Sequence, residues 1–143
     1  MVEHVLAALA GLNIDNCEIH ANRAEMPGDD GSSKAFSDAL SQTEVIELDA
    51  DRETIRVAST IRVGDKNSWI QADPVKQDLF ELEYQLQYAC PSIGSQTYQT
   101  RVTPEIFASE IAPARTFVLL EEAQELQKKG LGQRVSYKDI LVF

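Results

Sequence analysis

The first 32 residues carry the most informative pattern of the chain: Val2-Glu3-His4-Val5-Leu6-Ala7-Ala8-Leu9-Ala10-Gly11-Leu12 leads to Ile14-Asp15-Asn16, and then to Glu25-Met26-Pro27-Gly28-Asp29-Asp30-Gly31-Ser32. Helical spacing of apolar residues predicts an amphipathic helix over 2–12. Its buried stripe is expected to contain Val2, Leu6, Leu9 and Leu12. Residues 17–21 follow as a short strand candidate, and 22–31 are rich in turn formers. Ser32 or Ser33 is expected to cap a second helix with its apolar side at Ala35, Phe36, Ala39 and Leu40.

Beyond residue 42 the pattern changes from helical to strand-like. Residues 44–48, 54–63 and 68–72 are expected to form strands, with a hairpin turn at 64–67. Strict alternation over Phe80–Tyr88 predicts a strand that buries Leu82, Tyr84 and Leu86 and exposes Glu81 and Glu83. Another strand is expected at 98–102.

The last part of the chain returns to helical signals. Thr103 and Pro104 favour a capped short helix, and a longer helix is expected over 119–129 and ends at Gly130. Residues 140–143 favour a strand. The order of elements predicts an α+β fold of two small α/β sandwich units, each a sheet with helices packed on one face. The boundary is expected near 41–45, which gives an incomplete unit at 1–43 and a second unit at 44–143.

Composition limits the possible partners and compartment. The chain has 143 residues and a net charge of −10, with no Lys/Arg cluster of the kind that binds nucleic acid. Cys17 and Cys90 are far apart and in no Cys-x-x-Cys pair, which favours two small buried hydrophobic side chains in a reducing compartment over a disulfide framework or a thiolate zinc site. No apolar run approaches the ~20 residues of a membrane span, and the start lacks signal-peptide features. A cytoplasmic location is the expectation.

Glu3 and His4 are the first candidates for chemistry. Zinc hydrolases use a neutral imidazole to hold the metal and a carboxylate to accept a proton from water. Adjacent helical side chains point about 100° apart, so the two residues favour separate roles as ligand and base. Taken alone, a Glu-His pair is more often a surface or capping pair than a catalytic one.

Three segments together resemble the UDP-3-O-acyl-N-acetylglucosamine deacetylase family, the zinc amidases of lipid A biosynthesis. The first is the helix that opens with Glu3-His4, and the second is a Glu-x-Pro-x-x-Asp-Gly-Ser pattern. That pattern is matched at Glu25, Pro27, Asp30, Gly31 and Ser32. The third is Ala114-Arg115-Thr116-Phe117, before a helix that ends in Gly130-Leu131.

The resemblance implies a role for each matched residue. Glu3 would be the general base and His4 a zinc ligand, while the Thr116 hydroxyl would face the zinc and stabilise the oxyanion. Phe117 and Leu131 would line the passage for the acyl chain. The acidic loop, residues 25–32, would support the active-site wall.

At two places the chain departs from the family pattern in residues that would contact the nucleotide of the substrate. Where the family often has a Lys before a Trp, this chain has Ser68 before Trp69, with Lys66 two residues earlier. Tyr88, which could stack on uracil, is followed by Ala89 and Cys90 where the family has a His. The expected substrate remains UDP-linked acylated N-acetylglucosamine.

The resemblance also implies a partial enzyme of about half the family's length. His20 matches no ligand, and the family's other His and Asp ligands lie in a later helix, so His4 is the one matched zinc ligand. The chain is therefore expected to be inactive alone and to self-associate through exposed edges. The alternatives are a truncated or degenerate non-enzymatic paralogue that binds a partner or a sugar nucleotide, and an unrelated α+β domain.

Overall fold

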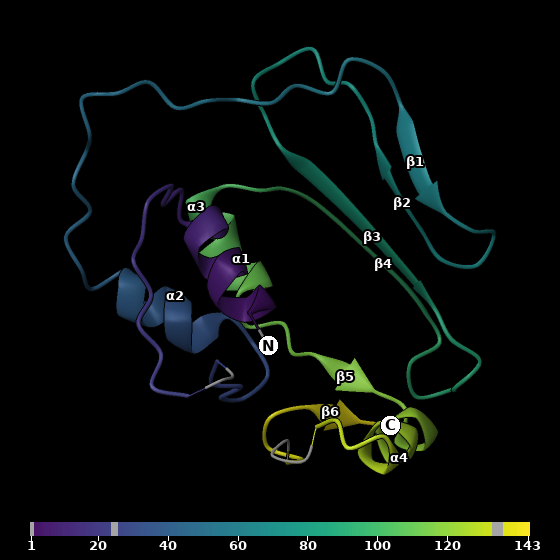
Figure 1. The fold of residues 1–143 in the computed structure, drawn as a ribbon. Coiled ribbons are helices and arrows are strands. Elements are labelled where there is room, and N and C mark those ends of the chain that lie inside the picture. The colour runs from purple at the N-terminus through teal and green to yellow at the C-terminus, as the bar shows by residue number, and fades with distance from the viewer. Residues whose placement is uncertain (1, 24–25, 133–135) are drawn as a thin grey trace.

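The computed structural model describes residues 2–23, 26–132 and 136–143. Helices and strands are mixed along the chain, which confirms the predicted α+β class (Figure 1). The elements are, in order, α1 (Glu3–Gly11), α2 (Lys34–Leu40), β1 (Ile61–Gly64), β2 (Trp69–Ala72), β3 (Glu81–Gln87), β4 (Ser95–Arg101), α3 (Pro104–Ile106), the π-helical turn η1 (Phe107–Ile111), β5 (Phe117–Val118), α4 (Leu120–Lys128) and β6 (Leu141–Val142). The division at residues 43 and 44 stays a prediction.

The core lies where α1, α2 and η1 meet. Ala8, Phe107 and Ala112 are buried together, and Phe36 and Leu40 of α2 pack against them. Small residues on α1 allow this approach, because helices come close where side chains are short. The helices therefore pack on one another here, where the sequence suggested packing on a sheet.

This packing corrects the predicted stripe of α1. Val2 and Leu6 are 55% and 53% exposed, whereas the buried residues of the helix are His4, Val5, Ala8, Leu9 and Gly11. Gly11 lies so close to the Phe107 ring that a β-carbon there would overlap it. The ring selects the small-residue face of α1, so the predicted stripe was wrong at Val2 and Leu6 and right at Leu9.

Two antiparallel hairpins follow. β1 pairs with β2 across the predicted turn, where the Asp65 carboxylate accepts hydrogen bonds from the Asn67 and Ser68 amides. β3 pairs with β4 and places Tyr84 opposite Tyr98. The alternation is confirmed at Leu82 and Leu86, which are half-buried, and at Glu81 and Glu83, which are exposed. Tyr84 is 53% exposed, so its predicted burial is wrong; among the described residues β3 pairs with β4 alone, in a two-stranded sheet.

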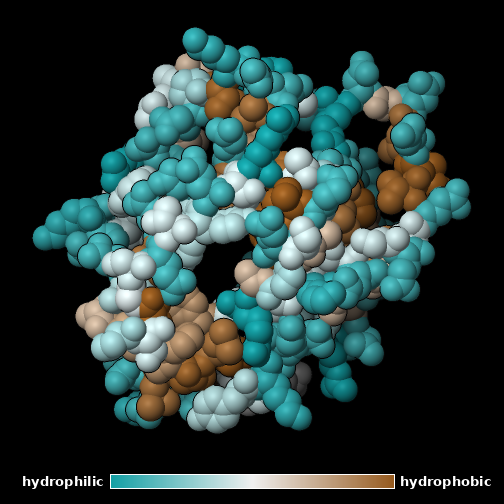
Figure 2. All heavy atoms as spheres, turned by 180° about the vertical axis from the view of Figure 1, so that it is seen from behind, coloured by the Kyte–Doolittle hydropathy of each residue, from teal (hydrophilic) through white to brown (hydrophobic). Residues whose placement is uncertain are grey.

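Three predicted strand segments lie outside any strand. Residues 17–21, 44–48 and 54–60 are irregular, because a strand requires a hydrogen-bonded neighbour and these segments have none among the described residues. Apolar side chains such as Ile46 and Ile55 are left exposed on the long connection between α2 and β1. Seen from behind, apolar residues reach the surface at several separate places (Figure 2).

The C-terminal elements form as expected. The Thr103 hydroxyl accepts a hydrogen bond from the Ile106 amide at 3.3 Å, α4 covers most of the predicted helix, and β6 pairs in parallel with β5. This pairing returns the end of the chain to the segment around Thr116.

Gly11→Ala is expected to lower the free energy of unfolding by about 1–3 kcal/mol, because the added methyl group must displace the Phe107 ring. Urea denaturation measures the change. Ala10→Ser, at an exposed position of the same helix, is the matched control and should stay within about 0.5 kcal/mol of the wild type. Equal effects of the two substitutions would contradict this packing.

Candidate functional site

Glu3, His4 and Thr116 lie together although 112 positions separate the last two. His4 is in the first turn of α1 and is 7% exposed. Its Nε2 atom lies 3.5 Å from Thr116 Oγ1 and 3.9 Å from Glu3 Oε1. The Glu3 side chain is 60% exposed and so faces solvent beside the buried imidazole. A carboxylate, an imidazole and a hydroxyl thus meet at one place.

Thr116 is held through its backbone. Its amide donates to the Gly31 carbonyl at 2.7 Å, and its carbonyl accepts from the Leu141 amide at 3.0 Å. Gly31 has φ +80°, and a β-carbon there would overlap the Asp139 carbonyl oxygen. Only glycine fits this close crossing of the two segments without strain.

The acidic loop holds its own shape through Asp30. The Asp30 carboxylate accepts hydrogen bonds from the amide and the hydroxyl of Ser32, which is fully buried. These bonds, chiefly that from the Ser32 hydroxyl, hold the pKa of Asp30 below its ordinary 3.8. Ser32 Oγ also accepts from the Lys34 amide at 3.2 Å, at the start of α2, whereas Ser33 at the N-cap position makes no side-chain cap hydrogen bond. Glu25 of the sequence pattern lies outside the described residues.

Aromatic rings lie next to Thr116. Phe117 contacts Tyr88 edge-on, with ring centroids 5.5 Å apart, and it contacts Phe143 at 5.9 Å. The structure thus brings together two of the three predicted substrate residues. Leu131 lies after α4 and is 56% exposed. Sequence reasoning missed Phe143, whose one signal was its position in the expected strand 140–143.

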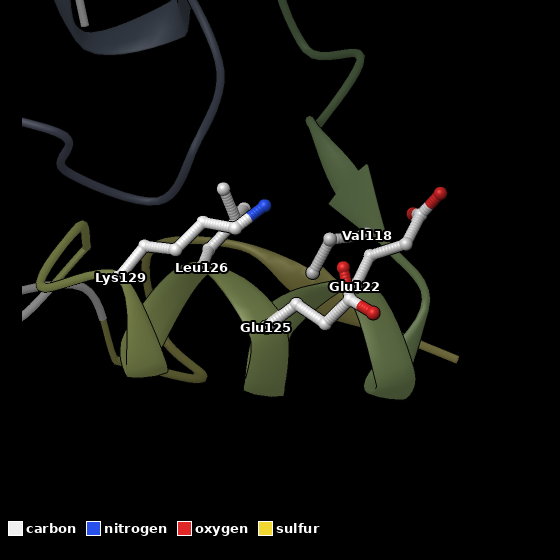
Figure 3. A pocket seen from close by; sticks show the side chains of 5 residues that line it. All are labelled: Val118, Glu122, Glu125, Leu126 and Lys129. Carbon is white, nitrogen blue, oxygen red and sulfur yellow. The ribbon is translucent and has the colours of Figure 1, made fainter.

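A shallow hollow of about 300 Å³ lies on α4 and β5 (Figure 3). Its lining residues are Val118, Glu122, Glu125, Leu126 and Lys129. The sequence assigned none of these residues a functional role. Glu122 already has a structural use, because its carboxylate accepts a hydrogen bond from the Leu119 amide at the start of α4.

The side chains around His4 do not form a complete zinc site within the described residues. A catalytic zinc typically has three protein ligands, whereas the described residues contain no group of three or more His, Cys, Asp or Glu side chains placed to hold a metal. His4 with Glu3 beside it does not make such a site by itself. No described helix has the length and apolar character needed to cross a bilayer.

Lowering the pH should reduce the stabilisation that the Asp30 carboxylate gives to the acidic loop. Because the folded pKa of Asp30 is lowered, the stabilisation is present above pH 3.8 and is lost as the pH falls through the folded pKa. Asp30→Asn should therefore lower the free energy of unfolding more at pH 6 than at pH 3, as measured by urea denaturation. Asp29→Asn removes the same charge from the adjacent position and serves as the control. An Asp30 effect that is equal at both pH values would contradict the assignment.

The chain is similar to known proteins over nearly its whole length. The family model described as LpxC, UDP-3-O-acyl N-acetylglycosamine deacetylase, matches residues 1–143. Proteins named UDP-3-O-acyl-N-acetylglucosamine deacetylase from Brucella ovis, Brucella canis and Brucella suis are each 36% identical to this chain over 141 residues. The match covers 99% of this chain and 49% of each relative, so the chain spans about half their length. The chain therefore belongs to the LpxC deacetylase family.

Proposed function

We propose that this chain forms part of a zinc-dependent amidohydrolase that removes the N-acetyl group of UDP-3-O-acyl-N-acetylglucosamine in lipid A biosynthesis, in the cytoplasm. The single observation that carries the proposal is the meeting of His4 with Thr116, 3.5 Å apart, beside the Glu3 carboxylate. These are the residues to which the family resemblance assigns ligand, oxyanion donor and base. Their convergence from opposite ends of the chain supports a shared role.

Each residue has a chemical task that suits its surroundings. Glu3, partly exposed to solvent, accepts a proton from the attacking water. The Thr116 hydroxyl is an uncharged donor, and it stabilises the negative charge that develops on the amide oxygen. His4 supplies one neutral imidazole ligand, and a bound zinc ion would polarise the amide carbonyl. The further ligands are proposed to come from outside these 143 residues.

The aromatic residues are proposed to bind the substrate. Tyr88 would stack on the uracil ring, and Phe117, whose ring contacts that of Tyr88, would line the acyl passage. Leu131, which lies after α4 and is 56% exposed, is proposed to extend this lining.

A second candidate is a non-enzymatic paralogue that binds a partner or a sugar nucleotide. Both candidates are consistent with the absence of a three-ligand group among the described residues. The two candidates differ in activity once the remaining length is restored, because the paralogue would stay inactive.

The 143-residue chain alone should hold zinc weakly and should release no acetate, because a single matched ligand fixes neither the affinity nor the geometry of the metal. The assay measures acetate release from the UDP-sugar, with bound zinc quantified in parallel. A protein extended by its own flanking coding sequence to the length of the relatives is the positive control. Robust turnover by the short chain would overturn the partial-enzyme proposal.

In the extended enzyme, Glu3→Ala should lower kcat by about 10²–10⁴-fold with zinc retained, because Glu3 is proposed to accept the proton of the attacking water and not to bind the metal. His4→Ala should lose zinc. Thr116→Val should lower kcat by about 10²-fold with a smaller change in KM, because its hydroxyl acts on the transition state. An unaffected Glu3→Ala variant would remove Glu3 from the mechanism.

Self-association is proposed for the isolated chain. Apolar side chains such as Ile55, Ile70 and Phe80 are 98%, 74% and 64% exposed, and such surfaces tend to be covered by another molecule. Light scattering should give a mass above that of one chain, and the mass should fall on dilution. A monomer at all concentrations would reject this proposal.

A further inference from the structure

Arg115 joins the two backbone segments that flank Thr116. Its Nε donates to the Asp30 carbonyl, and its Nη2 donates to the Lys138 carbonyl at 2.7 Å. One acceptor lies in the acidic loop and the other lies before β6. These segments are far apart in sequence, so the guanidinium group acts as a crosslink between them.

Thr116 is bound to the same two segments by its own main chain. Its amide bonds Gly31, the residue after Asp30, and its carbonyl bonds Leu141, three residues after Lys138. The Arg115 side chain and the Thr116 backbone therefore act in parallel. Any movement of either segment would also move Thr116 Oγ1, which lies 3.5 Å from His4 Nε2.

The chemistry of this crosslink requires a guanidinium group. A guanidinium is planar and presents five N–H donors in a fixed fork, so it can hold two carbonyls in set directions, whereas an ammonium group is a point charge on a flexible stem. The bond to Asp30 goes to the backbone, and the Asp30 carboxylate is occupied by Ser32. The positive charge of Arg115 has a lesser effect on the pKa of Asp30 than the Ser32 hydroxyl has.

We propose that Arg115 is the positioning residue that sets the Thr116 hydroxyl against the His4 imidazole. This role rests on the proposed function in one respect: the positioned hydroxyl stabilises the transition state of that reaction. The placement itself is a property of the folded chain. It can be measured without substrate and without metal.

The experiment records the ring ¹⁵N resonances of His4 at fixed pH with EDTA present, in the wild type, Arg115→Lys, Thr116→Val and the double variant. His20, whose side chain is 81% exposed, is the internal reference. Arg52→Lys is the matched control, because Arg52 also donates to a backbone carbonyl, that of Asn13, at a place away from His4. Thermal unfolding of each variant reports whether the fold is retained.

Arg115→Lys should shift the His4 resonances in the same direction as Thr116→Val, and the double variant should match Thr116→Val alone, because both changes act through one hydroxyl. His20 in all variants, and His4 in Arg52→Lys, should keep their wild-type resonances. Unchanged His4 resonances in Arg115→Lys, or shifts that add in the double variant, would overturn the proposal. Loss of cooperative unfolding in Arg115→Lys would also overturn it, since Arg115 would then serve the whole fold.

Activity separates this proposal from the proposed function. In the extended enzyme, Arg115→Lys should lower kcat with a smaller change in KM, as Thr116→Val does. An extended wild-type enzyme that releases no acetate would reject the deacetylase proposal, and the His4 resonances would still decide the role of Arg115.

Discussion

The close crossing of the acidic loop with the segment around Thr116 is the constraint on which the site depends. The Gly31 carbonyl accepts a hydrogen bond from the Thr116 amide. Gly31 also lies against the Asp139 carbonyl, where a side chain would not fit. Because Thr116 also pairs with Leu141, three segments of the chain are joined at one residue. The buried end of α1 then places His4 beside the Thr116 hydroxyl. Neither His4 nor Thr116 would be positioned by its local sequence alone.

Hydrogen bonds hold this crossing in place, because few apolar side chains are buried. The core comprises few buried apolar side chains, centred on Phe107, and many large apolar residues are exposed. Around the crossing, by contrast, Ser32 is fully buried and satisfied by Asp30, and Arg115 satisfies two carbonyls that belong to separate loops. Buried polar groups that are fully bonded specify one geometry, because any other arrangement would leave them without a partner. The same bonds that shape the loop thus set the site.

The structure brings together some, but not all, of the residues that the family resemblance predicts for catalysis. The residues assigned to base, oxyanion donor and one ligand converge, and the rings of Tyr88 and Phe117 are in contact nearby. The described residues do not provide three metal donors at that place. This agrees with a chain that covers about half the length of its relatives, 49% of each. The segments around Thr116 are held together by hydrogen bonds within the chain itself.

The sequence by itself determined the elements whose signals are local. The cap at Thr103 and the hairpin turn at 64–67 each depend on neighbours a few residues away, and the structure has them where they were predicted. Tertiary structure decided what depends on distant partners. The Phe107 ring chose the buried face of α1, and segments such as 44–48 formed no strand because no neighbour pairs with them among the described residues. The role of Arg115 was likewise invisible in sequence, since its carbonyl partners lie 85 and 23 positions away and backbone acceptors leave no mark on residue type.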